Sequence, residues 1–483
     1  MTTTRTDAAE HAVHLVGGRA VAATGGRRLH RIDPAGSGRG TTVVPATTAE
    51  VTAAVDAAWA ARREWRRTAP TERAACLRAA AAAHRANADR LGDLLTATTG
   101  RLVGQSRESA AVAADLLDEA ATTGLGNAGR VLAGAPAGLD VVRREPRGVV
   151  AVITPWNDPF PTAAGLLAAA LVTGNTVVHK PSERSAVPGW ELARLVAEAL
   201  PPGVLNVLTG DGETGAALVA DERVALVAHV GSTAAGRRIA AVAGARGAKV
   251  LRENGGADAV VVDSGLDPRW VAEQVALGAF TNTGQICTSV ERVYLPDGVA
   301  DAVLAELVTV AEGLVVGNPA DPATTLGPLV DRDQLAVVDK HVRAAVAGGA
   351  RCLTGGAPLD GPGVYYPATV LDRCPRETAA VAEETFGPVA AVVRVRDFDE
   401  ALALAGTGRY GLSATVLTPD LGRALRAAEE LEVGTVKVNG VFGGAPGGSA
   451  DPRRDSGSGA GYGPDLLTEM TVLKTVHLEA PPG

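Results

Sequence analysis

Cys287 and Glu253 are the two residues whose types and surroundings could support covalent catalysis. Cys287 ends the stretch Phe-Thr-Asn-Thr-Gly-Gln-Ile-Cys, and Glu253 lies upstream in the stretch Arg-Glu-Asn-Gly-Gly. An isolated cysteine is most often a small buried hydrophobe, which is the alternative for Cys287. A core cysteine has no need of the polar turn that precedes it, whereas a reactive thiolate is stabilised by backbone donors and polar groups. The pattern therefore predicts a nucleophilic thiol, with the carboxylate as the base that activates water for hydrolysis.

The composition of the chain excludes several other classes of protein. A chain of 483 residues is too long for one hydrophobic core, so two or three domains are expected. The net charge of −8 provides no basic surface for nucleic acid or anionic lipid. The four cysteines lie far apart, without the spacing of metal ligands, and the eight histidines do not cluster around them. We therefore expect no metal site, no nucleic-acid partner and a reducing compartment.

Neither a secretory signal nor a membrane span is expected. Residues 1–7 contain no apolar core of the kind that signal peptides have. The longest apolar run, residues 163–178, is interrupted by Gly165, Gly174 and Asn175 and is too short to cross a bilayer. These features predict a cytoplasmic protein with no membrane partner.

The elements that must position the two residues form two α/β series. Short strands and turns are expected over 5–45, and the first helix is expected to be capped by Thr47 or Thr48. The helices of this part are expected over 48–65, 70–97 and 106–121. From Gly148 onward, short apolar runs alternate with Ala- and Leu-rich helical segments, which is typical of a parallel, doubly wound sheet. The expected strands of this series are 149–153, 176–179, 204–208 and 224–228.

The second series begins at Ala259. Its expected strands are 259–262, 291–295, 389–394 and 413–417, and its expected helices are 268–279, 298–313, 331–347 and 420–431. Residues 124–148 alternate in a way that suggests hairpin strands, and residues 470–478 have the pattern of one last strand. Because a lone apolar edge strand needs a partner, this last strand predicts a dimer or tetramer.

Two glycine clusters could bind a nucleotide. Residues 210–215 match the Gly-x-Gly-x-x-Gly pattern after a strand, but no acidic residue ends a second strand about twenty positions on. Residues 231–236 also follow a strand, and Ser232 could cap a helix whose N-terminus receives a phosphate. An ordinary strand-to-helix turn is the alternative for both clusters. Lys180 and Glu183 end another strand, where the acid could bond ribose hydroxyls and repel an extra 2′-phosphate, or simply lie in a solvated turn.

With these segments in order, the chain resembles the aldehyde dehydrogenase superfamily over essentially its whole length. The matching motifs are Thr154–Asn157, Lys180–Glu183, Pro202–Val207, Gly231–Thr233, Glu253–Gly256, Phe280–Cys287 and Glu384–Pro388. The resemblance implies oxidation of an aldehyde to the carboxylic acid with NAD as cofactor, NADP being possible as well. By this resemblance Cys287 is the nucleophile and Glu253 the general base. Asn157 and the Cys287 backbone N–H would form the oxyanion hole.

The resemblance also implies a set of cofactor contacts. Lys180 and Glu183 would hold the adenosine ribose, and Ser232 would contact the pyrophosphate. Glu384 would hold the nicotinamide ribose, with Phe386 against the nicotinamide ring. The remaining residues expected around the cofactor are Thr154, Pro155, Trp156, Ser182, Gly210 and Gly231.

The fold that the resemblance implies is α/β, with a Rossmann-type cofactor domain, an α/β catalytic domain and a β-hairpin oligomerisation arm. Residues 1–123 and 147–255 would form the dinucleotide-binding domain, and residues 256–460 the catalytic domain. Residues 124–146 and 461–483 would form the oligomerisation domain of a homodimer or homotetramer.

Several positions depart from the family pattern. Asp158 replaces the aromatic residue that usually follows Pro-Trp-Asn, and residues 449–455 replace the usual Pro-Phe-Gly-Gly stretch. Ala460 and Gly461 replace an Arg-Glu pair whose carboxylate is sometimes proposed as a proton relay. These changes concern the shape of the substrate pocket and the release of the acyl group, and they leave the nucleophile in place.

The substrate is expected to be a bulky or apolar aldehyde rather than succinic semialdehyde. The arginines with which succinic semialdehyde members of the family hold a carboxylate are Gly165 and Thr281 here. Residues 162–165 are small, which predicts a wide entrance.

Two other functions stay open at this stage. A coenzyme A-acylating variant needs no general base, so Glu253 at its expected place argues against it. A catalytically silent binding or structural protein could keep the same fold, because function resides in sites rather than in folds. Intact Cys287, Glu253 and Asn157 argue against this second alternative.

Overall fold

The computed structural model describes residues 8–11, 13–134, 138–444 and 448–479. The segment 1–7, in which no signal peptide is expected, lies outside these described residues. Among the described helices, none combines the length and the apolar character that a membrane span requires.

The first of two large sheets has eight strands in the order β22-β12-β11-β8-β9-β10-β2-β3. Its central strands pair in parallel, and the strands at its two edges pair antiparallel. This arrangement confirms the predicted doubly wound sheet. The strands are β2 (Val13–Val16), β3 (Arg19–Ala22), β8 (Val149–Thr154), β9 (Thr176–Pro181), β10 (Leu205–Val207), β11 (Val224–Val230), β12 (Lys249–Glu253) and β22 (Gly457–Ser458).

Helices cover both faces of this sheet because its central strands are apolar on both sides. Along β8, Val150 and Val152 pack into one core with α2 to α6, and Val149 and Ala151 pack into another with α1 and α7. This alternation follows from the two-residue period of a strand. The helices are α1 (Thr48–Arg67), α2 (Pro70–Ala86), α3 (Ala88–Thr99), α4 (Val103–Thr123), α5 (Pro159–Val172), α6 (Ala186–Glu198), α7 (Gly212–Ala220) and α8 (Thr233–Ala245).

Two details of the helical part differ from the sequence prediction or complete it. The prediction of a single helix over 70–97 is wrong. The chain leaves helical geometry at Asn87, whose side-chain amide donates to the Ala83 carbonyl at 2.9 Å, and α3 begins at Ala88.

Of the two proposed caps of α1, Thr47 is the cap. Its hydroxyl accepts from the Glu50 N–H at 3.3 Å, and the Glu50 carboxylate accepts the Thr47 N–H at 2.8 Å, which together form a capping box.

The second large sheet has seven strands in the order β15-β16-β17-β14-β13-β19-β20. All of its pairs are parallel except the edge pair β15–β16. Alternate residues of β13 again enter two cores, one with α9 and α10 and the other with α11, α13 and α14. The strands are β13 (Asp258–Val262), β14 (Val290–Pro296), β15 (Arg351–Thr354), β16 (Thr369–Asp372), β17 (Val389–Val395), β19 (Ser413–Leu417) and β20 (Thr435–Val438), and the helices are α9 (Pro268–Phe280), α10 (Asp297–Glu312), α11 (Arg332–Ala347), α12 (Ala379–Ala382), α13 (Phe398–Ala405) and α14 (Leu421–Glu430).

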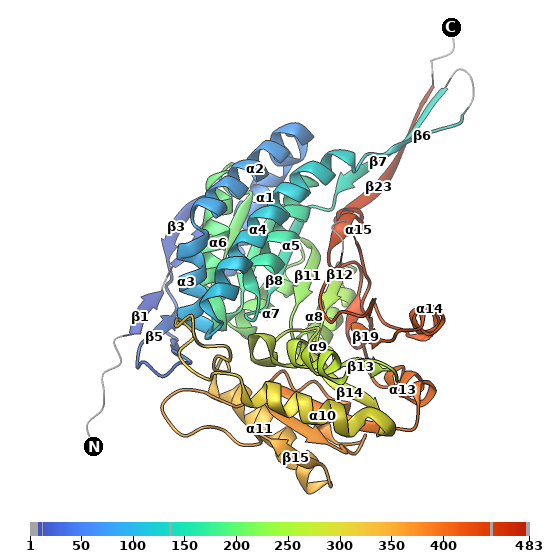
Figure 1. Ribbon diagram of the computed structural model, residues 1–483. Coiled ribbons are helices and arrows are strands. Elements are labelled where there is room, and N and C mark those ends of the chain that lie inside the picture. The colour runs from blue at the N-terminus through green and yellow to red at the C-terminus, as the bar shows by residue number, and fades with distance from the viewer. Residues whose placement is uncertain (1–7, 12, 135–137, 445–447, 480–483) are drawn as a thin grey trace.

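An antiparallel arm projects from the body of the protein (Figure 1). In it, β7 (Gly138–Pro146) lies between β6 (Arg130–Leu132) and β23 (Thr471–Glu479), which confirms the predicted hairpin strands and the last strand. Leu473 and Leu478 of β23 are more than half exposed, at 57% and 53%. By contrast α15 (Gly463–Glu469), which precedes β23, packs Leu466 and Leu467 into the core of the eight-stranded sheet. The domain boundaries given above stay a prediction.

Three short 3-10 helices and a few small strands complete the structure. The 3-10 helices are η1 (Gly124–Gly126), η2 (Glu183–Ser185) and η3 (Thr281–Gly284). A three-stranded sheet near the N-terminus is formed by β1 (Ala8–His11), β4 (Leu29–Ile32) and β5 (Gly40–Val43), and a two-stranded pair by β18 (Tyr410–Gly411) and β21 (Arg453–Arg454). The two large sheets are joined directly by residues 254–257, between the end of β12 and the start of β13.

Candidate active site

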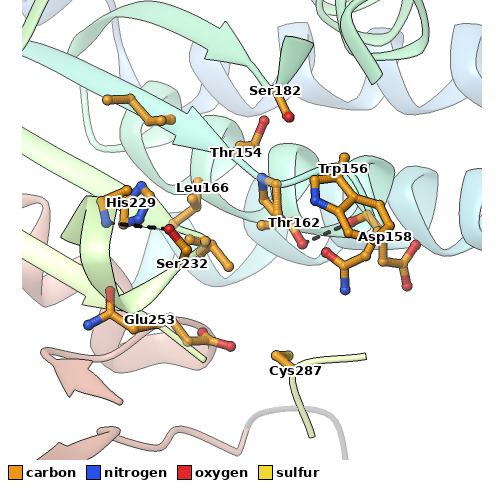
Figure 2. Close-up of a pocket in the computed structure, with 18 of the residues that line it drawn as sticks. Thr154, Trp156, Asp158, Thr162, Leu166, Ser182, His229, Ser232, Glu253 and Cys287 are labelled. Atoms are coloured by element: carbon orange, nitrogen blue, oxygen red, sulfur yellow. Dashed lines mark hydrogen bonds between the residues drawn. The ribbon is translucent and has the colours of Figure 1, made fainter. Parts of the chain in front are cut away.

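One cavity of about 840 Å³ is lined by strand ends of the eight-stranded sheet and by α11 and the loops that carry Cys287 and Phe386 (Figure 2). It contains the predicted catalytic residues Cys287, Glu253 and Asn157. Of the predicted cofactor residues, it is lined by Thr154, Pro155, Trp156, Lys180, Ser182, Glu183, Gly231, Ser232, Glu384 and Phe386. Gly210 is the one predicted residue that does not line it. The Gly210 carbonyl instead accepts a hydrogen bond of 2.9 Å from the Lys180 ammonium group.

The polar turn before Cys287 holds its backbone in an uncommon conformation. Asn282 and Thr283 have φ values of 50° and 58°, which non-glycine residues rarely adopt. The Asn282 amide donates to the Gln285 carbonyl at 3.1 Å, and the Thr283 hydroxyl donates to the Gly327 carbonyl at 3.0 Å. A side chain at Gly284 would lie 2.0 Å from the Gly387 carbonyl oxygen, so only glycine fits there. The turn that marks Cys287 in the sequence therefore presents the thiol to the cavity.

The charges around the Cys287 thiol keep it protonated. Burial raises its pKa well above the ordinary value, and the carboxylates of Glu253, Asp258 and Glu384 raise it further, as does Asp158. In Figure 2 the Glu253 side chain points toward Cys287, and its charge is the first of these charges in order of effect. Burial also raises the pKa of Glu253 itself. The thiol can therefore react only after its proton is removed or a positive charge approaches.

Asn157 links the end of β8 to the loop of Cys287. Its side-chain amide donates to the Gln285 carbonyl at 3.0 Å, and its own carbonyl accepts from Arg101 at 3.0 Å. Asn157 is 8% exposed. The second N–H of this amide has no partner among the residues that the structure describes, so it can donate a hydrogen bond to an oxygen atom in the cavity.

Gly461 explains one departure from the family pattern. A side chain at this position would begin 2.2 Å from the Glu253 carboxylate. Because Gly461 has no side chain, the Glu253 carboxylate can occupy this space. An Arg-Glu pair at 460–461 would displace the Glu253 carboxylate.

On the cofactor side, Lys180 is anchored to backbone carbonyls. It is 4% exposed, and its ammonium group donates to Pro181 and Gly210, each at 2.9 Å. Burial lowers its pKa. Lys180 thus reaches the cavity with the position of its side chain already set.

Glu183 belongs to a network of charged residues that the sequence analysis does not include. Its carboxylate lies 3.4 Å from the Arg31 guanidinium group, which is also 3.6 Å from Asp331. Asp331 in turn pairs with Arg184 at 2.7 Å. Arg31 and Asp331 lie far from Glu183 in the chain, so no local pattern indicates this network.

Both glycine clusters lie at helix N-termini beside the cavity. Ser232 caps α8, its hydroxyl accepting from the Ala235 N–H at 3.3 Å, and Asp211 caps α7 in the same way at 3.1 Å. Gly231 and Ser232 of the second cluster line the cavity, as do Gly212 and Gly215 of the first.

The loop Glu384–Phe386 is clamped by two residues that the sequence analysis does not identify. The buried Glu291 carboxylate accepts the N–H groups of Thr385 and Phe386, each at 2.8 Å. The Gln334 amide donates to the carbonyls of the same two residues, each at 3.0 Å. Phe386, which has a φ of 53°, meets Trp156 edge to face with ring centroids 5.5 Å apart. The ring is therefore held in the cavity by hydrogen bonds to its backbone.

Glu384 lies against the segment that joins the two sheets. Its carboxylate accepts the Gly256 N–H at 3.1 Å, and a side chain at Gly255 would lie 2.2 Å from it. Burial raises the pKa of Glu384 to about 7.

At the opposite end of the cavity, Asp158 is held between two neighbours. The Ser109 hydroxyl donates to its carboxylate at 2.5 Å, and the Arg101 guanidinium group lies 3.5 Å away. The walls at this end are mostly small or apolar. They include Leu116, Ala120, Thr162, Gly165, Leu166, Ala169, Leu466 and Leu467.

Comparison with known proteins places this arrangement in context. The chain matches the aldehyde dehydrogenase family over residues 21–476. It is 37% identical over 447 residues to the alpha-ketoglutarate semialdehyde dehydrogenase of Haloferax volcanii, covering 89% of this chain and 90% of the relative. It is 35% identical over 479 residues to the betaine aldehyde dehydrogenase of Cereibacter sphaeroides, covering 97% of each. The crystal structure of an NAD-dependent aldehyde dehydrogenase from Sinorhizobium meliloti superposes with a TM-score of 0.94 at 31% identity, covering 98% of this chain and 96% of that one.

The raised pKa of Cys287 predicts slow alkylation. In the protein without ligands, iodoacetamide should modify exposed Cys352 faster than Cys287, and the Cys287 rate should rise about tenfold per pH unit between about pH 7 and pH 10. Glu253→Gln should increase the Cys287 rate several-fold at about pH 8, because it removes the neighbouring carboxylate that raises the thiol pKa most. Peptide mass spectrometry of timed samples measures both rates. Glu273→Gln on α9 is the matched control, and a Cys287 rate that is fast and independent of pH would contradict the prediction.

Proposed function

Since this chain belongs to the aldehyde dehydrogenase family and is an NAD(P)-dependent oxidoreductase that acts on an aldehyde, we propose that Cys287 is its nucleophile and Glu253 its general base. The observation that carries this proposal is geometric. Both side chains and Asn157 line the same cavity as the glycine-rich strand ends. The volume of about 840 Å³ lies within the range of roughly 300–1,000 Å³ that is usual for ligand pockets.

The residues of the cofactor side suit a dinucleotide. The N-terminus of α8 reaches the cavity through Gly231 and Ser232, and its free backbone N–H groups and positive dipole end favour a pyrophosphate. The Glu183 carboxylate can accept hydrogen bonds from ribose hydroxyls. Glu384 and Phe386 would contact the nicotinamide end, beside Cys287. When bound, the dinucleotide supplies the acceptor for hydride.

The first step joins the aldehyde to Cys287. The thiol releases its proton to solvent, and the resulting thiolate forms a bond to the carbonyl carbon. The carbonyl oxygen becomes an oxyanion, which the Asn157 amide and the Cys287 backbone N–H stabilise; one such donor contributes about 3–4 kcal/mol. Breaking of the C–H bond then releases hydride, restores the carbonyl group and leaves a thioester on the sulfur.

The second step hydrolyses the thioester. Glu253 takes a proton from water, and the resulting hydroxide attacks the thioester carbon. The C–S bond breaks and the carboxylic acid leaves. Glu253 passes its proton to the released thiolate, so that both groups are ready for the next turnover. Because burial raises the pKa of Glu253, this carboxylate is a stronger base than an exposed one. Gly461 leaves the space that its side chain needs.

Two alternatives fit the cavity less well. A coenzyme A-acylating enzyme has no use for a base beside the thiol, whereas the Glu253 charge acts directly on Cys287. A silent binding protein has no need to keep Cys287, Glu253 and Asn157 on one cavity wall together with the cofactor residues.

We further propose that the substrate is a bulky or apolar aldehyde. The substrate end of the cavity is mostly apolar, and the ionisable residues among its described lining residues are the acids Asp158 and Glu119. These acids disfavour a substrate with a carboxylate, such as the one for which the Haloferax volcanii relative is named. Gly165 adds no side chain there and lies in open space, which widens the entrance.

Glu253→Gln is expected to separate the two steps. If Glu253 activates the water, this variant should release about one NADH per active site in a rapid burst, followed by a steady rate about 10²- to 10⁴-fold below that of the unaltered enzyme. Cys287→Ala should give neither burst nor steady rate, because no thiohemiacetal can form. Stopped-flow absorbance of NADH measures both phases. Glu273→Gln should behave as the unaltered enzyme, and a Glu253→Gln steady rate within a factor of two of normal would exclude Glu253 as the base.

A substrate panel tests the proposed specificity. Values of kcat/KM for aromatic and long-chain aldehydes should exceed the value for succinic semialdehyde by at least about tenfold, because a carboxylate would face Asp158, whose neighbouring cation, Arg101, already pairs with it. Asp158→Asn should narrow this difference by raising the value for succinic semialdehyde. A panel in which succinic semialdehyde is the best substrate would refute the proposal.

We also propose that the arm mediates a homodimer or homotetramer. The outer edge of β23 is unpaired within the described chain, and Leu473 is 57% exposed on it. Leu473→Asp should therefore reduce the molar mass measured by light scattering after size-exclusion chromatography. Leu359→Asp, at an exposed leucine outside the arm, is the control. An unchanged mass for Leu473→Asp would argue against assembly through the arm.

A further inference from the structure

A second cavity, of about 310 Å³, is lined by none of the residues that line the first. It lies against β14 and β18, and its charged described lining residues are Arg292, Arg376 and Arg409. The other polar residues that line it are Tyr294, Tyr410 and Thr407. No carboxylate is among the described residues that line it, so the pocket presents only positive charge and hydroxyl groups.

Arg292 is buried in this pocket without a paired acid. It is 8% exposed, and its Nε donates to the Ala257 carbonyl at 2.6 Å. Its Nη1 donates to the Thr407 carbonyl at 3.2 Å and to the Tyr294 hydroxyl at 3.4 Å. The remaining nitrogen, Nη2, has no hydrogen-bond partner, and no carboxylate lies within ion-pair distance of the guanidinium group, in the part of the chain that the structure describes. Because an unpaired buried charge is costly, this group favours an anion in the pocket.

The other two arginines add to this charge. Arg376 is exposed and has neither a hydrogen bond nor an ion pair within the described ranges. Arg409 pairs with Asp455 at 2.7 Å, and Asp455 is itself shared with Arg237. From outside the lining, Glu383 also acts on Arg409. Glu400 acts on Arg376, and Asp258 acts on Arg292, in each case beyond ion-pair distance. The charged side chains that line the pocket are therefore all positive, and the acids that act on them lie outside its lining.

We propose that this arginine pocket binds a small phosphate-bearing anion. Guanidinium groups offer paired N–H donors that match phosphate oxygens, and the tyrosine hydroxyls add further donors. The volume lies at the low end of the usual range of roughly 300–1,000 Å³, which favours inorganic phosphate or a small phosphate ester over a nucleotide. Through its bond to Ala257, Arg292 connects this pocket to the segment 254–257 that joins the two sheets.

Inorganic phosphate is the probe for this site. NAD⁺-saturated full-length protein, whose pyrophosphate site is already filled, is titrated with phosphate at constant ionic strength against a chloride control. The pocket predicts a saturable rise in Tm, since a ligand that binds only the folded state stabilises it. Arg376→Ala and Arg292→Lys should each weaken the apparent phosphate affinity at least tenfold. Arg396→Ala, at an exposed arginine outside the pocket, should leave it unchanged.

The outcomes separate this site from the others. Arg376 makes no hydrogen bond or ion pair with the residues that the structure describes, so its alanine variant should fold normally and decide the result even if the Arg292 variant is unstable. No saturable rise beyond that of chloride with NAD⁺ bound would overturn the proposal. Equal phosphate affinity in Arg376→Ala and the unaltered protein would overturn it too. Tighter binding of citrate than of phosphate would replace the phosphate assignment with a carboxylate one.

Discussion

The short segment 254–257, which carries the chain from one large sheet to the other, is the constraint on which the site depends. A side chain at Gly256 would lie 2.9 Å from the Cys287 carbonyl oxygen, and the Gly256 N–H bonds Glu384 at 3.1 Å. Ser456 holds the segment from the other side, since its hydroxyl donates to the Gly255 carbonyl at 2.8 Å. Because Glu253 ends β12 immediately before this segment, the segment constrains where the Glu253 carboxylate lies relative to the thiol.

Much of this architecture can be predicted from local sequence. The central strands of both sheets are apolar on both faces, and their short runs between helical segments identify a parallel doubly wound fold. Cys287 is recognisable because its turn needs glycine at 284 and polar side chains at 282 and 283. Residues at strand ends, such as Lys180, can be assigned to the ligand edge of the sheet for the same reason.

What sequence alone does not reveal are partners that meet across long stretches of chain. Glu291 lies in a strand and resembles any strand residue there, yet its carboxylate fixes the backbone of the loop that carries Phe386. The contacts of Arg31 with Glu183 and Asp331 join three distant segments. Asn87 illustrates a local limit: an Ala-rich stretch predicts one helix, and a single asparagine that bonds back to Ala83 divides it.

The four carboxylates around Cys287 also affect how fast its thiol is oxidised in the protein without ligands. Peroxide and other oxidants attack the thiolate, and the protonated form is largely inert toward them. A sulfur that stays protonated until its ligands assemble is therefore protected from conversion to sulfenic or sulfinic acid while the protein waits. The carboxylates that oppose the reaction of the Cys287 thiol with an aldehyde thus also slow the oxidation of this thiol.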